Sequence, residues 1–287
     1  MKVSVSCYSF SQQFRAGKMT QLDCVAKAKE MGFDGIEFTD IVGDDLAQQK
    51  AYAREIREEA DRVGIEINAY TIGANLFQPT PEAQAAEIQR LKGQVEVAAI
   101  LGAKVMRHDV CYALGKTGAS RSFGMMLPTI AEGARQVTAY AETLGIKTCT
   151  ENHGYIAQDS YRVEQLFNAV AHDNYGLLVD IGNFLCADED PAMAVSRVAP
   201  YAVHVHLKDM LYRSAPSGNC RNMTRGGNYF CGTVVGEGDV PVKQCLRIIK
   251  ATGYDGFISL EYEGAEDCLT GIARGLANVK KFLEELQ

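Results

Sequence analysis

The second half of the chain carries three carboxylates and one imidazole, each at the end of a short apolar run. The four runs read KTCTENH, GLLVDIGN, VHVHLKD and FISLEYEG, and the residues are Glu151, Asp180, His206 and Glu261. About one βα unit separates the first three in turn, and the last gap leaves room for one more unit and an insertion. This mostly oxygen donor set suits one divalent ion, with Mn²⁺ favoured and Mg²⁺, Co²⁺ or Zn²⁺ as alternatives.

Side chains alternate between the two faces of a strand, so the phase of these groups can be tested. In VHVHLKD, the valines and the leucine take one face and leave His204, His206 and Lys208 on the other. In FISLEYEG, the same alternation puts Glu261 opposite the apolar side chains. A single acidic residue at a strand end is more often a helix cap or an ion-pair partner, and His204 alone would be a packed residue. Four ligand types in phase on successive strands favour a metal site.

The elements that position these groups alternate strongly along the chain. Amphipathic helical stretches end at a glycine just before the next strand, as in EMGFDGIEF, RVGIEI and LGIKTC, which is typical of a left-handed helix C-cap. Strands are expected at 3–9, 35–39, 66–71, 104–109, 147–152, 176–181, 202–208 and 257–262. No GxGxxG follows the first of them, so the pattern predicts an α/β fold, a (β/α)8 TIM barrel, with its active site at the C-terminal strand ends.

Composition limits the possible organisation and partners. The chain has 287 residues, 47% of them hydrophobic, and no linker divides it, so residues 1–287 are expected to form a single domain with an inserted loop at about 210–240 after the seventh strand. The net charge of −7 disfavours nucleic acid and anionic membranes. With no leader pattern and no long apolar run, we expect a soluble cytoplasmic protein.

Nine cysteines are scattered through the expected strands and helices without any CxxC pair. This usage is typical of reduced thiols in a cytosol. Cys220 and Cys231 share one loop and could pair, but we expect them to be reduced as well.

Several motifs resemble those of one family. ENHG at 151–154, VDIGN at 179–183, HVHLKD at 204–209, GEGDVP at 236–241 and ISLEYEG at 258–264 are similar to the xylose isomerase-like TIM barrel superfamily of sugar phosphate isomerases and epimerases, including ketose 3-epimerases. The resemblance implies that the four candidate ligands bind one divalent ion. It also implies that Glu151 and Glu261 exchange protons with the substrate.

A proton next to a sugar carbonyl is weakly acidic, and a divalent ion stabilises the enediolate that forms when it leaves. One glutamate can remove the proton and the other can return it from the opposite face. Inversion at carbon is the natural product of this arrangement.

Six further residues are candidates for contacting the substrate. Asn183 stands where many relatives have a histidine that helps to hold the substrate, so a ketohexose-type binding mode is in question. The candidates are His108, His153, Asn183, Lys208, Arg213 and Arg225. For each arginine of the insertion, a role in a solvated loop or a subunit contact is an equal alternative.

The leading hypothesis is a metal-dependent isomerase or epimerase of a sugar or sugar phosphate. The second is a lyase that acts on a keto-sugar, either an inosose dehydratase or the catalytic subunit of a C-glycoside deglycosidase. An apurinic endonuclease-type phosphodiesterase and an inactive sugar-binding subunit are weaker alternatives. The expected partner is a small sugar molecule, with no nucleic acid and no membrane. We expect a homo-oligomer, a dimer or a tetramer, or a second small subunit if the deglycosidase alternative holds.

Overall fold

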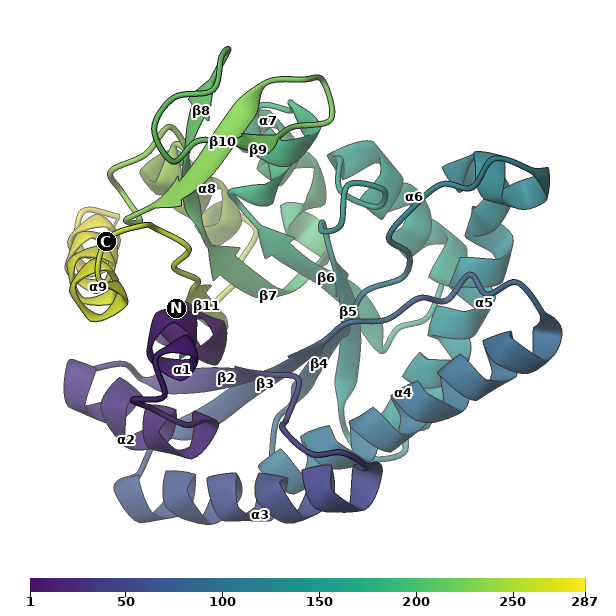
Figure 1. Ribbon diagram of the computed structural model, residues 1–287, viewed down its shortest axis with the longest axis horizontal. Coiled ribbons are helices and arrows are strands. Elements are labelled where there is room, and N and C mark those ends of the chain that lie inside the picture. The colour runs from purple at the N-terminus through teal and green to yellow at the C-terminus, as the bar shows by residue number, and fades with distance from the viewer. Residues whose placement is uncertain (287) are drawn as a thin grey trace.

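Eight parallel strands close into a barrel with helices around its outside (Figure 1). The computed structural model describes residues 1–286. Around the barrel the order is β1, β11, β7, β6, β5, β4, β3, β2 and back to β1. The strands span Lys2–Ser6 (β1), Gly35–Thr39 (β2), Glu66–Ile72 (β3), Val105–His108 (β4), Lys147–Glu151 (β5), Tyr175–Asp180 (β6), Ala202–Leu207 (β7) and Phe257–Leu260 (β11). The predicted TIM barrel and all eight predicted strands are confirmed, with ends shifted by a few residues.

Helices connect each strand to the next and cover the outward faces of the strands. They are α1 (Ser11–Arg15), α2 (Gln21–Met31), α3 (Leu46–Val63), α4 (Pro81–Leu101), α5 (Phe123–Glu142), α6 (Ser160–Val170), α7 (Pro191–Val198), α8 (Val242–Ala251) and α9 (Cys268–Glu284). Between residues 1 and 286, none of them combines the length and the apolar character that crossing a membrane requires.

The helix boundaries follow the local sequence signals closely. Thr20 begins α2 with a full capping box to Asp23. The glycine after α2, Gly32, has φ of 87°, so the predicted left-handed C-cap is present. The N-cap of α6 is Asp159, whose side chain accepts a hydrogen bond from the backbone N–H of Arg162, and α5 ends at Glu142.

The barrel interior is polar and the layer between strands and helices is apolar. Outward side chains such as Ile36, Phe38 and Val205 are fully buried under the helices. Inside the barrel, small serines on β1 and β11, such as Ser4 and Ser259, are buried. Their short side chains leave room for larger polar groups from β2, β5, β6 and β7, because neighbouring strands share the limited interior of an eight-stranded barrel.

The segment between β7 and α8 forms a small antiparallel sheet in place of the expected loop. The three strands are β8 (Asp209–Arg213), β9 (Asn222–Met223) and β10 (Tyr229–Thr233), in the order β8, β10, β9. This sheet, which we call the insertion sheet, stands out from one side of the barrel (green in Figure 1).

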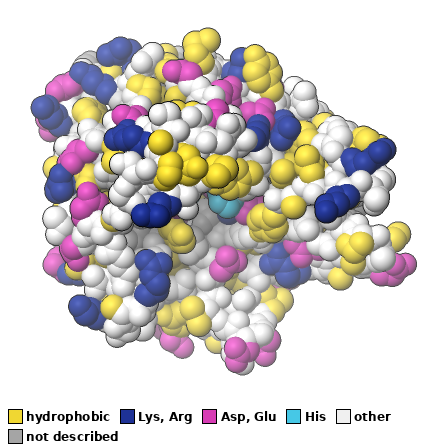
Figure 2. All heavy atoms as spheres, turned by 45° about the horizontal axis from the view of Figure 1, so that its top comes forward, with side chains coloured by type: hydrophobic (Ala, Val, Ile, Leu, Met, Phe, Trp, Pro, Cys, Tyr) yellow, Lys and Arg dark blue, Asp and Glu magenta, His cyan; other side chains and the backbone are white. Residues whose placement is uncertain are grey.

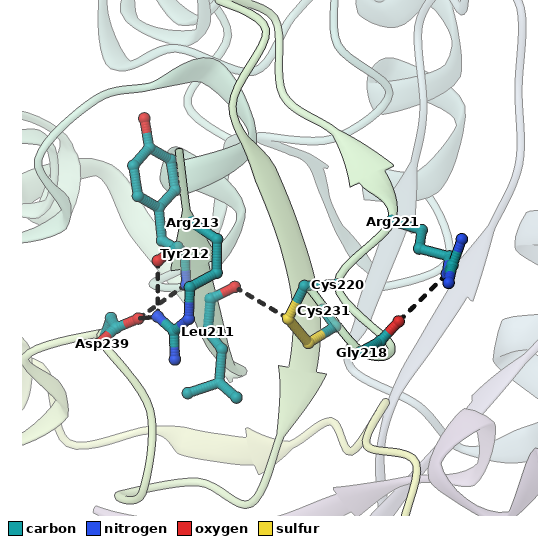
Figure 3. Close-up of a disulfide and its surroundings, with 8 residues drawn as sticks. All are labelled: Leu211, Tyr212, Arg213, Gly218, Cys220, Arg221, Cys231 and Asp239. Carbon is teal, nitrogen blue, oxygen red and sulfur yellow. Dashed lines mark hydrogen bonds and ion pairs between the residues drawn. A yellow bond between two sulfur atoms is a disulfide. The ribbon is translucent and has the colours of Figure 1, made fainter. Parts of the chain in front are cut away.

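A disulfide joins Cys220 to Cys231 in the insertion sheet (Figure 3). The expectation that all nine cysteines are reduced was therefore wrong at this pair. The pairing of β10 with β8 sets Cys231 opposite Leu211, and a turn closed by Ser217 brings Cys220 back over it. The other seven cysteines are buried free thiols.

Candidate metal centre

The four predicted ligands meet at one point inside the barrel mouth. Nδ1 of His206 lies 3.7 Å from Oε1 of Glu151, 3.9 Å from Oδ2 of Asp180 and 3.7 Å from Oε2 of Glu261. All four ligand atoms fall within 4.8 Å of one another. Six ligands about 2.1 Å from an ion in octahedral geometry would be roughly 3.0 to 4.2 Å apart. The spacing therefore fits one divalent cation.

Two of these ligand atoms have no hydrogen-bond partner although they are buried. They are Oδ2 of Asp180 and Nδ1 of His206. A buried polar atom without a partner costs on the order of 1–3 kcal/mol, so native structures rarely retain one without a reason. Burial raises the pKa of Asp180 to about 6, and the negative charges of Glu151 and Glu261 add to this while Lys208 opposes it. A cation among these atoms would satisfy both of them and would keep Asp180 ionised.

The other oxygen of Asp180 is held firmly by the chain. Its Oδ1 accepts hydrogen bonds from the backbone N–H groups of Gly182, at 2.7 Å, and Asn183, at 2.9 Å. The backbone N–H of Asp180 in turn donates to the side-chain oxygen of Asn152. One oxygen of the carboxylate is thus fixed, which directs the other one toward the cluster.

Glu37, on β2, is a functional candidate that our reading of the strand ends missed. It is fully buried, with Oε2 2.6 Å from Nε2 of His204 and Oε1 2.7 Å from Nε2 of His206. A carboxylate at Nε2 leaves Nδ1 of His206 free to bind a metal, an arrangement that is typical of metal-binding histidines. The signal in the sequence was GIEF, where a glutamate between two apolar residues must face the interior.

The pKa shifts of this pair agree with that arrangement. Burial alone would raise the pKa of Glu37, but the charge of His206 and the contacts with His204 and His206 lower it well below its ordinary range. Burial would likewise lower the pKa of His206, and the charges of Glu37, Glu261 and Glu151 raise it instead. The imidazole of His206 is thus the main positive partner of Glu37.

Each predicted catalytic glutamate lies against a buried cation. Nη2 of Arg107 is 2.6 Å from Oε2 of Glu151, and Nζ of Lys208 is 2.6 Å from Oε2 of Glu261. Burial would lower the pKa of Lys208, but the charge of Glu261 and other nearby carboxylates raise it well above its ordinary value. Burial would raise the pKa of Glu261, and Lys208 and His206 lower it. Glu261 is therefore surrounded by groups that favour its ionised form.

Asn183 acts on the same carboxylate as Arg107. Its Nδ2 donates a hydrogen bond to Oε1 of Glu151 at 2.9 Å, and its Oδ1 lies 3.4 Å from Nζ of Lys208. The structure thus places this predicted substrate contact between the two sides of the cluster, where it orients Glu151.

A cavity of about 460 Å³ opens above the cluster, a size within the usual range for small-molecule sites. Figure 2 shows a hollow on this face, with a histidine, acidic and hydrophobic side chains gathered beside it. Its lining residues include Tyr8, Thr39, Asp40, Thr71, Arg107, Asp109, Tyr112, Glu151, His153, His206, Lys208, Glu261 and Glu263. Glu151, His153, His206, Lys208 and Glu261 were all named from the sequence.

Four predicted substrate contacts lie away from this cavity lining: Asn183, which lies between the two sides of the cluster, His108, Arg213 and Arg225. His108 is buried, with Nδ1 2.9 Å from the carbonyl oxygen of Asp109, and burial lowers its pKa. Its neighbour Arg107 faces the cavity in its place, because side chains alternate along β4.

The two arginines of the insertion that were predicted to contact the substrate form ion pairs outside the cavity. Arg213 pairs with Asp239 at 2.8 Å (Figure 3), and Arg225 pairs with Asp159 at 2.7 Å. Both pairs connect the insertion sheet to neighbouring loops of the barrel.

The fold and this site agree with a family match. Residues 25–286 match the family described as the xylose isomerase-like TIM barrel, and the chain belongs to that family.

Relatives within this fold carry out more than one reaction. Inosose dehydratase from Clostridium perfringens strain 13 is 25% identical over 138 residues, which cover 47% of this chain and 46% of that enzyme, about half its length. L-ribulose-5-phosphate 3-epimerase UlaE from Escherichia coli SMS-3-5 is 24% identical over 280 residues, which cover 90% of this chain and 88% of the epimerase. The crystal structure of a D-tagatose 3-epimerase-like protein superposes with a TM-score of 0.74 at 20% identity, covering 100% and 98% of the two chains, and shows the same fold.

Proposed function

We propose that this protein is a divalent-metal-dependent enzyme of sugar metabolism that removes a proton next to a sugar carbonyl and isomerises or epimerises its substrate. The observation that carries the proposal is the convergence of four potential ligand atoms on one point. Two of them belong to Glu151, which contacts Arg107, and to Glu261, which contacts Lys208. Glu151, Asp180, His206 and Glu261 would hold the ion, and their oxygen-rich donor set favours Mn²⁺. When bound, such an ion would stabilise the negative charge that develops on the carbonyl oxygen.

The protein's own groups account for the proton transfer. Glu151 ends β5 and Glu261 follows β11, and two other strands, β6 and β7, separate these along the barrel. Their carboxylates can therefore lie on different sides of a sugar. Glu151, oriented by Arg107 and Asn183, accepts the proton from carbon. Glu261 takes a proton from the ammonium group of Lys208, 2.6 Å away, and passes it to the other face of that carbon. Exchange of the two roles gives the reverse reaction, and inversion follows.

A lyase reaction on a keto-sugar is the second candidate. The same proton abstraction starts the elimination of water or of another group. An inosose dehydratase is among the relatives, and its match covers about half of each chain. The products separate the two reactions, because only a lyase releases part of its substrate.

The test is a screen of ketoses, ketose phosphates and keto-glycosides with the Mn²⁺-loaded protein in D2O, followed by NMR and mass spectrometry. We expect deuterium to enter the sugar without loss of any group, and Glu151→Gln to abolish this. Glu132→Gln, on the exposed surface of α5, is the matched control and should keep full activity. Release of water or an aglycone would favour the lyase, and full activity of Glu151→Gln would remove Glu151 from the reaction.

A further inference from the structure

We propose that the natural substrate is an uncharged keto-sugar that carries an apolar, aromatic substituent. Its sugar ring would occupy the cavity above the metal cluster, and its substituent would lie in an adjoining groove on the other side of Tyr8. The inference rests on the proposed function, and two independent features of the structure support it.

The first feature is an apolar groove of about 420 Å³ that adjoins the sugar cavity. The two spaces share Tyr8 and Thr39 in their walls. The groove then extends along Phe14 and Met19 toward Val42. These residues follow β1 and β2, so the groove opens at the same C-terminal end of the barrel as the cavity. In the proposed complex, the substituent of a sugar in the cavity extends past Tyr8 into this groove.

The polar groups of the groove are already satisfied by the chain. The amide of Gln21 donates to the carbonyl oxygens of Thr39, at 3.3 Å, and Asp40, at 3.0 Å, and its oxygen accepts from the backbone N–H of Val42. The hydroxyl of Tyr52 accepts from the backbone N–H of Leu22. Few polar atoms remain to bind a hydrophilic group, and the surface left for a ligand is apolar.

This apolar surface is exposed in the protein alone. Val42 is 65% exposed and Tyr8 is 44% exposed. Each Å² of apolar surface that a ligand removes from water contributes about 25 cal/mol, so a flat aromatic ring is a favourable occupant. The ring of Tyr8 at the boundary can also pack against it.

The second feature is the charge of the sugar cavity, where the cationic side chains already have partners. Arg107 contacts Glu151 and lies 3.1 Å from Asp109, while Lys208 contacts Glu261 and lies 3.2 Å from Glu263.

The remaining polar groups of the cavity also disfavour a negatively charged substrate. His153 lies 3.2 Å from Asp109, and Asp40 adds a further carboxylate to the wall. A phosphate needs cationic donors that are free to bind it, and it is repelled by carboxylates at this range. Within the described lining, the charge pattern thus favours a neutral sugar over a sugar phosphate.

The experiment compares matched probes with the full-length, Mn²⁺-loaded protein. Calorimetry measures the binding of phenyl β-D-glucoside, methyl β-D-glucoside and glucose 6-phosphate, and NMR in D2O measures proton exchange in the phenyl and methyl 3-keto-glucosides. We expect the phenyl compound of each pair to bind about tenfold or more tightly than the methyl compound. Glucose 6-phosphate should bind more weakly than either glucoside.

A pair of variants locates the effect. Val42→Asp should remove the preference for phenyl over methyl, whereas Met193→Asp, at an exposed methionine on α7, should keep it. Circular dichroism and metal content confirm that both variants are folded and loaded. Equal binding of the phenyl and methyl compounds, or tighter binding of the phosphate, would overturn this inference and leave the proposed function standing. Phenyl preference without any proton exchange would overturn the proposed function and leave the groove as a binding site.

Discussion

The candidate metal centre and the insertion sheet are both rich in charged side chains, but they differ in how those charges are paired. In the cluster, Asp180 and His206 each leave a buried atom without a partner, and both atoms point to the same place. In the insertion sheet, Arg213 and Arg225 each have a carboxylate partner, and both pairs are partly exposed. Buried polar atoms that lack a hydrogen-bond partner and lie on rigid strands indicate a binding site for a ligand or an ion. Charged side chains that pair with one another indicate a structural role.

Asp180→Asn should produce the largest effect that separates the two regions. The amide cannot supply the anionic oxygen at the centre of the cluster, so retained Mn²⁺ should fall by about 100-fold or more. Isothermal titration with MnCl2 measures this directly. Asp239→Asn, which loses the partner of Arg213, is the control and should bind Mn²⁺ as the wild type does. If both variants bound equally well, the cluster would not be the metal site.

Glu37→Gln should have the next largest effect. The substitution keeps the size of the side chain but removes the charge that faces His206, and loss of such outer partners typically weakens metal binding by about 10- to 100-fold. The same titration should show this loss while the circular dichroism spectrum stays unchanged. Unaltered affinity would mean that Glu37 only fills the barrel interior.

Protonation of Asp188 in acid should destabilise the insertion sheet. Its carboxylate accepts hydrogen bonds from Tyr212, Thr224 and Asn228, all of which belong to that insertion. Burial would raise the pKa of Asp188, but these hydrogen bonds lower it below its ordinary value of 3.8. A lowered pKa in the folded state stabilises the protein above pH 3.8, and that stabilisation disappears as the pH falls through the lower folded value.

Limited proteolysis of the insertion sheet across this pH range tests the point. The wild type should be more resistant than Asp188→Ala at neutral pH, and the two should converge in acid. A difference that persisted unchanged at low pH would show that the charge of Asp188 is irrelevant to it.

Arg225→Gln should have the smallest effect. Its exposed ion pair with Asp159 contributes about 0–1 kcal/mol to the free energy of unfolding. Because Arg225 lies away from the cavity lining, KM for a turned-over sugar should change by less than about twofold. A large rise in KM with unchanged stability would instead show that Arg225 contacts the substrate. The insertion sheet would then have a role in binding as well as a structural one.

Much of this molecule follows from local sequence patterns. Strand alternation, glycine caps such as Gly32 and the spacing of the apolar runs predicted eight strands, the TIM barrel and the four residues of the cluster. These features could be predicted because side-chain phase and capping depend on residues that are close together in the chain.

Only the tertiary structure decided what surrounds those residues. Glu37 lies 167 positions from His204, and nothing local shows that β2 brings it to the histidines of β7 across the barrel interior. The disulfide between Cys220 and Cys231 likewise depends on the pairing of β10 with β8. Contacts of this kind are set by how the closed barrel and its insertion fold in space. The sequence alone therefore determined the candidate ligands, and the tertiary structure decided which groups contact them.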